Sequence, residues 1–106
     1  MDSHDNRRFA RVNIPLEVSC SALSGHYEAR TVDIGGGGCY IESVLRVNPG
    51  DVIDFNVKLP EGEWLPLKGE VVYVHPGVGF GLKYIGIEDE QQQEILRFVE
   101  SKLLEE

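Results

Sequence analysis

Three arginines stand close together near the start of the chain. They are Arg7, Arg8 and Arg11, three of only ten basic residues in a chain of 106 residues with formal net charge −8. A guanidinium is a planar fork of N–H donors that suits phosphate oxygens, and it stacks on flat rings. In a chain that is acidic as a whole, this cluster predicts a local site for a small anion. The overall negative charge argues against general binding of nucleic acid or anionic lipid.

An acidic residue followed by glycines is the second chemical feature. Asp33 and Ile34 precede four consecutive glycines, Gly35 to Gly38. An ionised aspartate only accepts hydrogen bonds, which suits a ligand that offers N–H donors. Glycines carry no β-carbon, so a flat ligand can lie against their backbone N–H groups. The alternative interpretation is a tight turn or bulge. A phosphate loop is excluded, since no Gly-Lys-Ser/Thr follows and the next element is a strand.

Alternating apolar residues predict the strands that must position these groups. Val12 to Cys20 alternate strictly, which predicts one strand with Pro15 at an edge or a bulge. The other predicted strands are 27–32, 39–42, 53–59, 64–75 and 78–84. The run from Val71 to Val74 blurs the alternation and favours burial on both sides or a bulge. In the last strand Val78, Phe80, Leu82 and Tyr84 share one face, and Gly79, Gly81 and Lys83 share the other, where the glycines permit a close approach.

Residues 88–106 change to helical spacing. Apolar residues recur at helical intervals from Ile95 to Leu103, with Asp89 predicted as the N-cap and Gln92 at the capping-box position. The chain is therefore predicted to be a single domain, residues 1–106, dominated by β-structure. We expect a flexible arm over 1–10, a small six-stranded antiparallel β-barrel over 11–85 and a C-terminal α-helix over 88–106.

The motifs and the strand pattern together resemble a known family. Arg7 to Arg11 before a strand, Asp33 to Gly38, and Gly77 to Phe80 before a helix resemble the PilZ domain of bacterial cyclic-di-GMP receptors, over nearly the whole chain. The signatures of that family are R-x-x-x-R and D/N-x-S-x-x-G. Arg7 and Arg11 match the first signature, and Asp33 and Gly38 match the second.

The resemblance implies cyclic-di-GMP as the ligand, with no other cofactor and no metal. The implied ligand-binding residues are Arg7, Arg8, Arg11, Asp33, Gly35, Gly37 and Gly38. Gly35 stands where the family usually has serine, and the loss of one hydroxyl hydrogen bond predicts binding weakened by roughly 2- to 13-fold. Asn6 stands where some members have a further arginine, which leaves one or two bound nucleotides as alternatives.

Three function classes are compatible with this pattern. The preferred one is a receptor or adaptor whose arm becomes ordered on binding cyclic-di-GMP and which signals to an unidentified effector protein. The alternative is a PilZ-like module for protein–protein interaction with weak or no nucleotide binding. An oligonucleotide-binding barrel would need basic and aromatic residues spread along a groove, whereas here the basic residues are confined.

The remaining polar groups give little sign of catalysis or metal binding. His4, His26 and His75 are scattered, and no Ser/His/Asp or Cys/His set is discernible, so we expect no enzyme activity. Cys20 and Cys39 are expected to be reduced and packed as small hydrophobic residues. The sequence shows neither a signal peptide nor an apolar run of bilayer length, which favours a cytoplasmic protein without membrane insertion. Trp64 is expected to pack locally.

Overall fold

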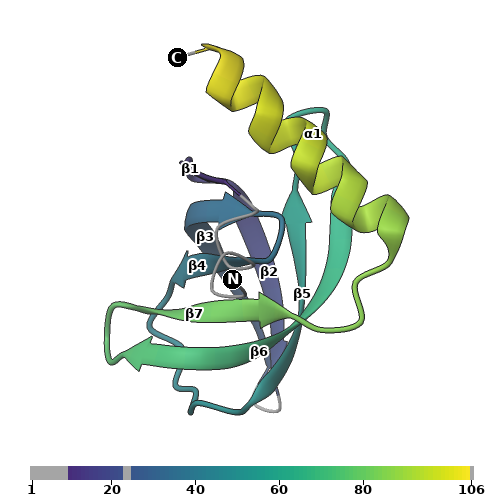
Figure 1. Ribbon diagram of the computed structural model, residues 1–106. Helices are drawn as coiled ribbons and strands as arrows, with labels where there is room; N and C mark the ends of the chain where they lie inside the picture. The colour runs from purple at the N-terminus through teal and green to yellow at the C-terminus, as the bar shows by residue number, and fades with distance from the viewer. Residues whose placement is uncertain (1–9, 23–24, 106) are drawn as a thin grey trace, which may run out of the picture.

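Seven antiparallel strands form one sheet that closes on itself (Figure 1). The computed structural model describes residues 10–22 and 25–105 of the chain. The sheet order is β1-β3-β2-β5-β6-β7-β4, and β4 pairs back onto β3. The strands are β1 (Arg11–Asn13), β2 (Glu17–Ala22), β3 (Gly25–Gly35), β4 (Gly38–Glu42), β5 (Val52–Lys58), β6 (Trp64–His75) and β7 (Gly79–Tyr84). The predicted six-stranded barrel is confirmed, with β1 as an additional short strand on β3.

The apolar face of each strand points into the barrel. Phe55, Phe80, Ile34 and Ile41 are almost completely buried there. Helix α1 (Asp89–Glu105) lies diagonally across the upper part of the barrel in Figure 1 and adds Ile95, among others, to the same core. The predicted C-terminal helix is therefore confirmed, and it contributes to the core rather than standing apart from it.

The first predicted strand is interrupted at Pro15. Proline has no N–H to give to a ladder of hydrogen bonds, so β1 ends before it and β2 begins after it. The buried hydroxyl of Thr31 fills the gap: it donates to the carbonyl of Ile14 at 2.6 Å and accepts from the N–H of Leu16 at 2.9 Å. A continuous strand from Val12 to Cys20 was thus wrong, whereas the bulge or edge expected at Pro15 is confirmed.

The N-cap of the helix lies one residue before its predicted position. Glu88 is the N-cap, because its carbonyl accepts the first helical hydrogen bond, from the N–H of Gln92 at 2.9 Å. Gln91 occupies the capping-box position and accepts from the N–H of Glu88 at 3.0 Å. Asp89 as N-cap was therefore wrong. This shift by one residue frees the side chain of Gln92 for a contact described below.

Two details of the last strands also differ from simple alternation. The pairing of β6 with β7 shifts register between Val71 and Tyr73, which confirms a bulge at the blurred stretch. Val78 lies in the turn before β7 and is 57% exposed, so its predicted place beside Phe80 was wrong. The side chains of Phe80, Leu82 and Tyr84 are buried as predicted.

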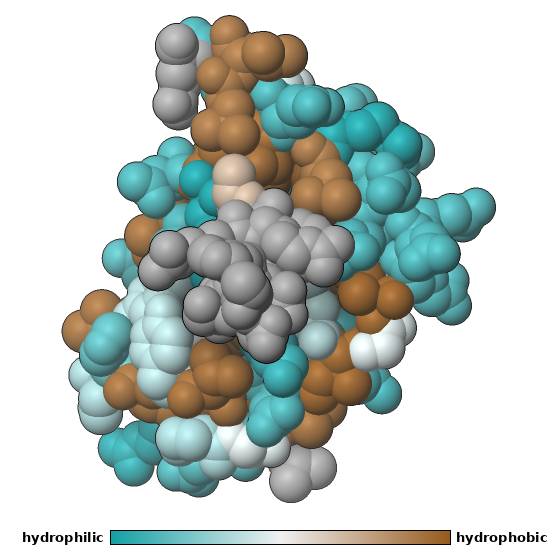
Figure 2. Space-filling model, viewed as in Figure 1, coloured by the Kyte–Doolittle hydropathy of each residue, from teal (hydrophilic) through white to brown (hydrophobic). Residues whose placement is uncertain are grey.

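The outer surface is mostly polar, with an apolar end to the helix. Figure 2 shows hydrophilic residues along much of the surface and hydrophobic residues at the top, near the C-terminus. Leu103 and Leu104, in the last turn of α1, are 43% and 82% exposed. No helix in the described part of the chain is long and apolar enough to cross a bilayer.

Candidate functional site

The predicted arginine and aspartate meet on the outside of the barrel. Arg11 in β1 donates to Asp33 Oδ1 from Nε at 2.9 Å and lies within 2.8 Å of the same oxygen through Nη2. The two residues are 22 positions apart, and the pairing of β1 with β3 brings them together, with Arg11 opposite Gly35 and Asn13 opposite Asp33. Both side chains remain accessible, 48% and 27% exposed. The other carboxylate oxygen of Asp33 accepts no hydrogen bond from a described residue.

The glycine run forms the turn between β3 and β4, and its carbonyl groups are held from within the protein. Gly35 accepts a hydrogen bond from the Tyr84 hydroxyl at 3.0 Å, and Gly36 accepts one from Gln92 Nε2 at 2.9 Å. Gly37 accepts one from the backbone N–H of Tyr84 at 3.1 Å. The carbonyl oxygens of three successive glycines thus accept hydrogen bonds from β7 and α1. This arrangement fixes the turn and leaves it little acceptor capacity for a ligand.

Two of the four glycines, Gly35 and Gly38, are required by close approach and not by backbone conformation. None of them has a positive φ. A β-carbon on Gly35 would lie 2.7 Å from the carbonyl oxygen of Ala10 and 2.8 Å from Cγ of Arg11. A β-carbon on Gly38 would lie 2.2 Å from the carbonyl oxygen of Leu82. Gly35 therefore gives room to the segment that carries Arg11, whereas Gly38 allows β4 to pack against β7. Gly37 is exposed at the turn.

An aromatic cluster continues the same outer surface. The ring centroids of Tyr40, Tyr73 and His75 lie 5.4 to 5.9 Å apart, and Tyr40 Oη is 2.8 Å from His75 Nδ1. The rings occupy the space that the small residues of β7 leave open: a β-carbon on Gly79 would meet the Tyr40 ring at 2.7 Å, and one on Gly81 would meet the Tyr73 ring at 2.4 Å. The close approach predicted at these glycines is thus made by the protein itself, by the Tyr73 ring at Gly81 and by the Ile41 carbonyl together with the Tyr40 ring at Gly79.

Strand register connects the ion pair to the aromatic cluster. Asp33 is opposite Tyr40, Tyr40 is opposite Gly81, and Gly81 is opposite Tyr73. Partial desolvation raises the pKa of Tyr40, with smaller contributions from Tyr73, Asp33 and Glu42, so the hydroxyl keeps its proton at neutral pH. The surface thereby offers guanidinium, carboxylate and flat rings side by side.

Lysine on β7 is a further cation next to the glycine turn. Lys83 is exposed and stands directly opposite Gly38 in the pairing of β4 with β7. It makes no ion pair with another described residue. Sequence reasoning missed Lys83, Tyr40 and His75 as site residues. The alternation of Gly79, Gly81 and Lys83 was the available signal, but their partners depend on register.

A buried network supports the turn from below. Burial raises the pKa of the Cys39 thiol to about 12 and that of Cys20 to about 11, so both stay protonated at neutral pH. Tyr84, which holds Gly35, has its pKa raised well above 10, first by burial and then by the neighbouring Cys39. Both cysteines are free thiols, as expected. No buried polar side-chain atom in the described chain lacks a hydrogen-bond partner.

The structure brings together part of the predicted site. Arg11, Asp33 and Gly35 lie in contact, and Gly37 and Gly38 belong to the adjoining turn. Arg7 and Arg8 lie outside the described residues, as does the rest of the predicted flexible arm except for Ala10. Among described residues no group of three His, Cys, Asp or Glu side chains is arranged to hold a metal ion.

Comparison with known families identifies the fold. The profile of the PilZ domain matches residues 5–101, so this chain belongs to the PilZ domain family. The search of curated proteins found no match.

Solved structures agree with that assignment. The Bacillus subtilis inhibitor of motility MotI/DgrA superposes with a TM-score of 0.85 at 18% identity, covering 94% of this chain and 52% of that one. Escherichia coli YcgR in complex with c-di-GMP gives 0.81 at 12% identity, covering 93% and 46%. The PilZ domain of YcgR with c-di-GMP gives 0.76 at 13%, covering 93% and 92%. Identities this low show a common fold. The chain spans about half the length of the first two proteins.

Proposed function

We propose that this chain is a cyclic-di-GMP receptor or adaptor domain that passes the signal to a partner protein. The observation that carries the proposal is the contact of Arg11 with Asp33 beside the glycine turn. Two residues from separate signatures form one accessible patch, and their chemistry suits the phosphate and the guanine edge of the ligand. The solved YcgR structures with c-di-GMP share the fold and support this choice.

In the proposed complex, Arg11 and Asp33 bind different parts of the ligand. Arg11 keeps Nη1 for a phosphate or for guanine O6/N7 while its other nitrogens face Asp33. The carboxylate of Asp33 accepts from guanine N1 and N2, with one hydrogen bond to each oxygen, while Oδ1 also accepts from Arg11. Arg7 and Arg8 would add further donors once the arm becomes ordered on the ligand. Gly35 gives room to Arg11, Gly38 places β4 against β7, and Gly37 leaves the tip of the turn exposed to the ligand. Lys83 adds positive charge next to the turn.

The exposed tyrosines extend the proposed site beyond the two signatures. Tyr73 is 45% exposed and lies beside Tyr40, next to Asp33 across the strands. Stacking of a base on an aromatic ring contributes about 1–3 kcal/mol, so Tyr73→Ala should weaken binding. Trp64→Ala is the matched control, because Trp64 is 46% exposed and stands far along β6 under the ammonium of Lys58.

Isothermal titration of the purified chain with cyclic-di-GMP tests the proposal, with GTP and single-stranded DNA as control ligands. Arg11→Ala removes one charge-assisted hydrogen bond and should weaken binding by roughly 10- to 160-fold. Arg46→Ala removes the same charge from an exposed loop position and should leave affinity unchanged. Absence of binding at millimolar ligand, or equal effects of the two variants, would reject the receptor and favour the protein–protein interaction module.

A further inference from the structure

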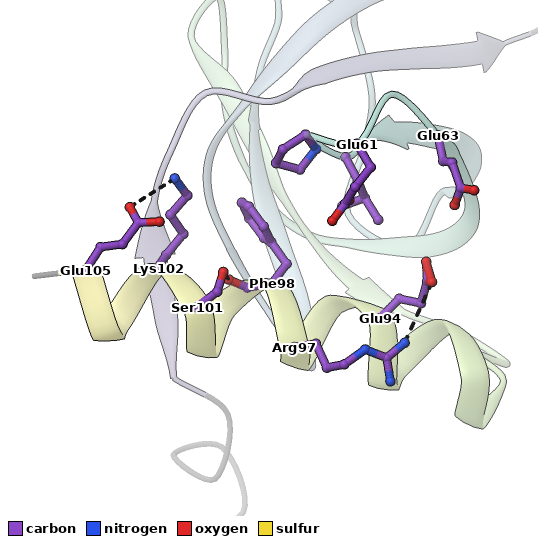
Figure 3. Close-up of a pocket in the computed structure, with 10 residues that line it drawn as sticks. Glu61, Glu63, Glu94, Arg97, Phe98, Ser101, Lys102 and Glu105 are labelled. Carbon is purple, nitrogen blue, oxygen red and sulfur yellow. Dashed lines mark hydrogen bonds and ion pairs between the residues drawn. The ribbon is translucent and has the colours of Figure 1, made fainter.

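A groove separate from the proposed nucleotide site runs between α1 and the loop that joins β5 to β6. It has a volume of about 510 Å³. Its floor is apolar, formed by Leu59, Pro60 and Phe98, of which Leu59 and Phe98 are buried. Figure 3 shows Phe98 rising between the helix and the loop. Leu59 and Phe98 expose little of their surface, and together with the exposed Pro60 they offer a small apolar area that fits one apolar side chain of an incoming segment.

Carboxylates line both rims of this groove. Glu61 and Glu63 belong to the loop, and Glu94 and Glu105 belong to the helix. In Figure 3 the side chains of Glu61 and Glu63 lie on the side that faces α1, and Glu94 extends from the helix toward the loop. Like charges gathered along one groove repel one another, which an occupant of opposite charge would relieve.

The cations of the groove do not balance its anions. Arg97 lies 3.7 Å from Glu94, and Lys102 lies 3.3 Å from Glu105, so each cation is already paired on the helix. Four carboxylates against two cations leave a net charge of −2 (2 − 4). Glu61 and Glu63 have no ion pair with another described residue. The unpaired carboxylates are therefore those of the loop rim.

We infer that this groove docks a basic segment of a partner protein, in which lysine or arginine flanks an apolar anchor. The anchor would sit on Phe98 and the cations would face Glu61 and Glu63. A bare metal ion does not fit, because no metal-binding group of side chains occurs among the described residues. A phosphate-bearing ligand would be repelled. A second copy of the chain would bring a net charge of −8 toward an acidic groove.

A peptide titration followed by amide NMR tests this inference on the full chain. The probe is a peptide of about 12 residues with lysine and arginine on one helical face and leucine on the other, which spans about 18 Å as a helix. A peptide with glutamine in place of every basic residue is its control. We expect shifts concentrated at residues 59–63 and 94–105 with the basic peptide, and weaker or no shifts with the control.

Matched variants locate the contact. Glu61→Gln with Glu63→Gln should weaken binding of the basic peptide by roughly 2- to 30-fold, because two rim contacts are lost. Glu90→Gln with Glu100→Gln removes the same charge from helix positions outside the groove and should have little effect. Shifts spread over the acidic surface, or equal weakening by both pairs, would overturn the inference. The inference would also be overturned if the chain dimerised at the titration concentration through the groove, since a second copy would then be the occupant.

Discussion

Arg11 directs both Nε and Nη2 to one oxygen of Asp33, at 2.9 and 2.8 Å. The remaining guanidinium nitrogen and the second carboxylate oxygen are left out of this pair. Ion pairs with this degree of exposure contribute at most about 1 kcal/mol to stability. The pair therefore contributes little to the stability of the fold, and its main consequence is that it fixes the positions of two side chains of the proposed site.

The first prediction separates these two roles. Asp33→Asn should change the free energy of unfolding by less than about 1 kcal/mol, because the pair is solvent-exposed. It should still weaken cyclic-di-GMP binding, because a carboxamide cannot accept from both N1 and N2 of guanine as a carboxylate does. Urea unfolding and calorimetry measure the two quantities on the same sample. A large loss of stability would show that the pair supports the fold and would remove the reason for assigning it to recognition.

The second prediction distinguishes two glycines of the same run. Gly38→Ala should cost about 1–3 kcal/mol of stability or more, because its β-carbon would meet the Leu82 carbonyl at 2.2 Å in the barrel wall. Gly35→Ala would instead press on Ala10 and Arg11, at the end of the short strand β1. Its effect should be confined to that strand.

Hydrogen exchange shows where each glycine substitution acts. With Gly35→Ala the amides of β1 and Ile14 should exchange faster while those of β5 and β6 remain as in the wild type. With Gly38→Ala protection should fall throughout the barrel. The assignment of separate roles fails if both variants lower protection throughout the barrel to the same extent.

The third prediction concerns the contact between helix and turn. Gln92→Ala removes the donor that Gly36 uses at 2.9 Å, which should lower stability by about 1 kcal/mol. It should also weaken cyclic-di-GMP binding, because the turn beside Asp33 loses its support from α1. Gln93→Ala, at an exposed position of the same helix, should stay within about 0.5 kcal/mol of the wild type. Equal affinities of the two variants would show that the helix does not position the turn.

The fourth prediction follows from the buried thiols. Burial raises the pKa of Cys20 from 9.0 to about 11 and that of Cys39 from 9.0 to about 12. As pH rises, the unfolded chain loses these protons first, so their contribution to stability is present below pH 9 and is lost as pH rises toward 11 and 12. Urea unfolding at stepwise pH should show stability falling above pH 9. A variant with Cys20→Ala and Cys39→Ala should show a shallower fall over that range, and an unchanged slope would contradict the prediction.

Thiol modification gives an independent measure of the same burial. Each unit of pKa lowers the thiolate fraction tenfold, so at pH 8 native Cys20 should react with a disulfide reagent at least about 100-fold more slowly than in urea. Rapid reaction of the native chain would indicate that the barrel opens around β2.

Sequence reasoning recovered the barrel and the helix because period-two alternation and helical spacing are direct consequences of a single buried core. It failed where hydrogen bonds, and not the alternation of apolar and polar residues, decide the local structure. Pro15 interrupts one apparent strand, and the Thr31 hydroxyl that spans the gap could not be placed without the fold. The N-cap was predicted one residue too late. Gln91 and Gln92 are chemically equivalent, so the sequence does not show which of the two side chains accepts from the N–H of the N-cap residue; packing decides this.

The site was predicted in part for a related reason. Arg11 and Asp33 could be assigned to one site from motifs alone, since arginine suits phosphate and the O6/N7 edge of guanine and aspartate suits the N–H donors of guanine. The cluster of Tyr40, Tyr73 and His75 depends on register across β4, β7 and β6 and on a bulge in β6, none of which the local sequence specifies. The different steric tasks of Gly35 and Gly38 likewise depend on what lies opposite each of them.

Tyr84 is tied to the glycine turn across 49 positions of the chain, through its hydroxyl on Gly35 and its backbone N–H on Gly37. During synthesis on the ribosome, the residues of the turn are added to the chain well before Tyr84, whose hydrogen bonds hold the turn in place. A nascent or truncated chain that stops short of β7 would carry both signatures without a rigid receptor surface. Under the proposed function, such a chain should bind cyclic-di-GMP more weakly than the chain that includes β7.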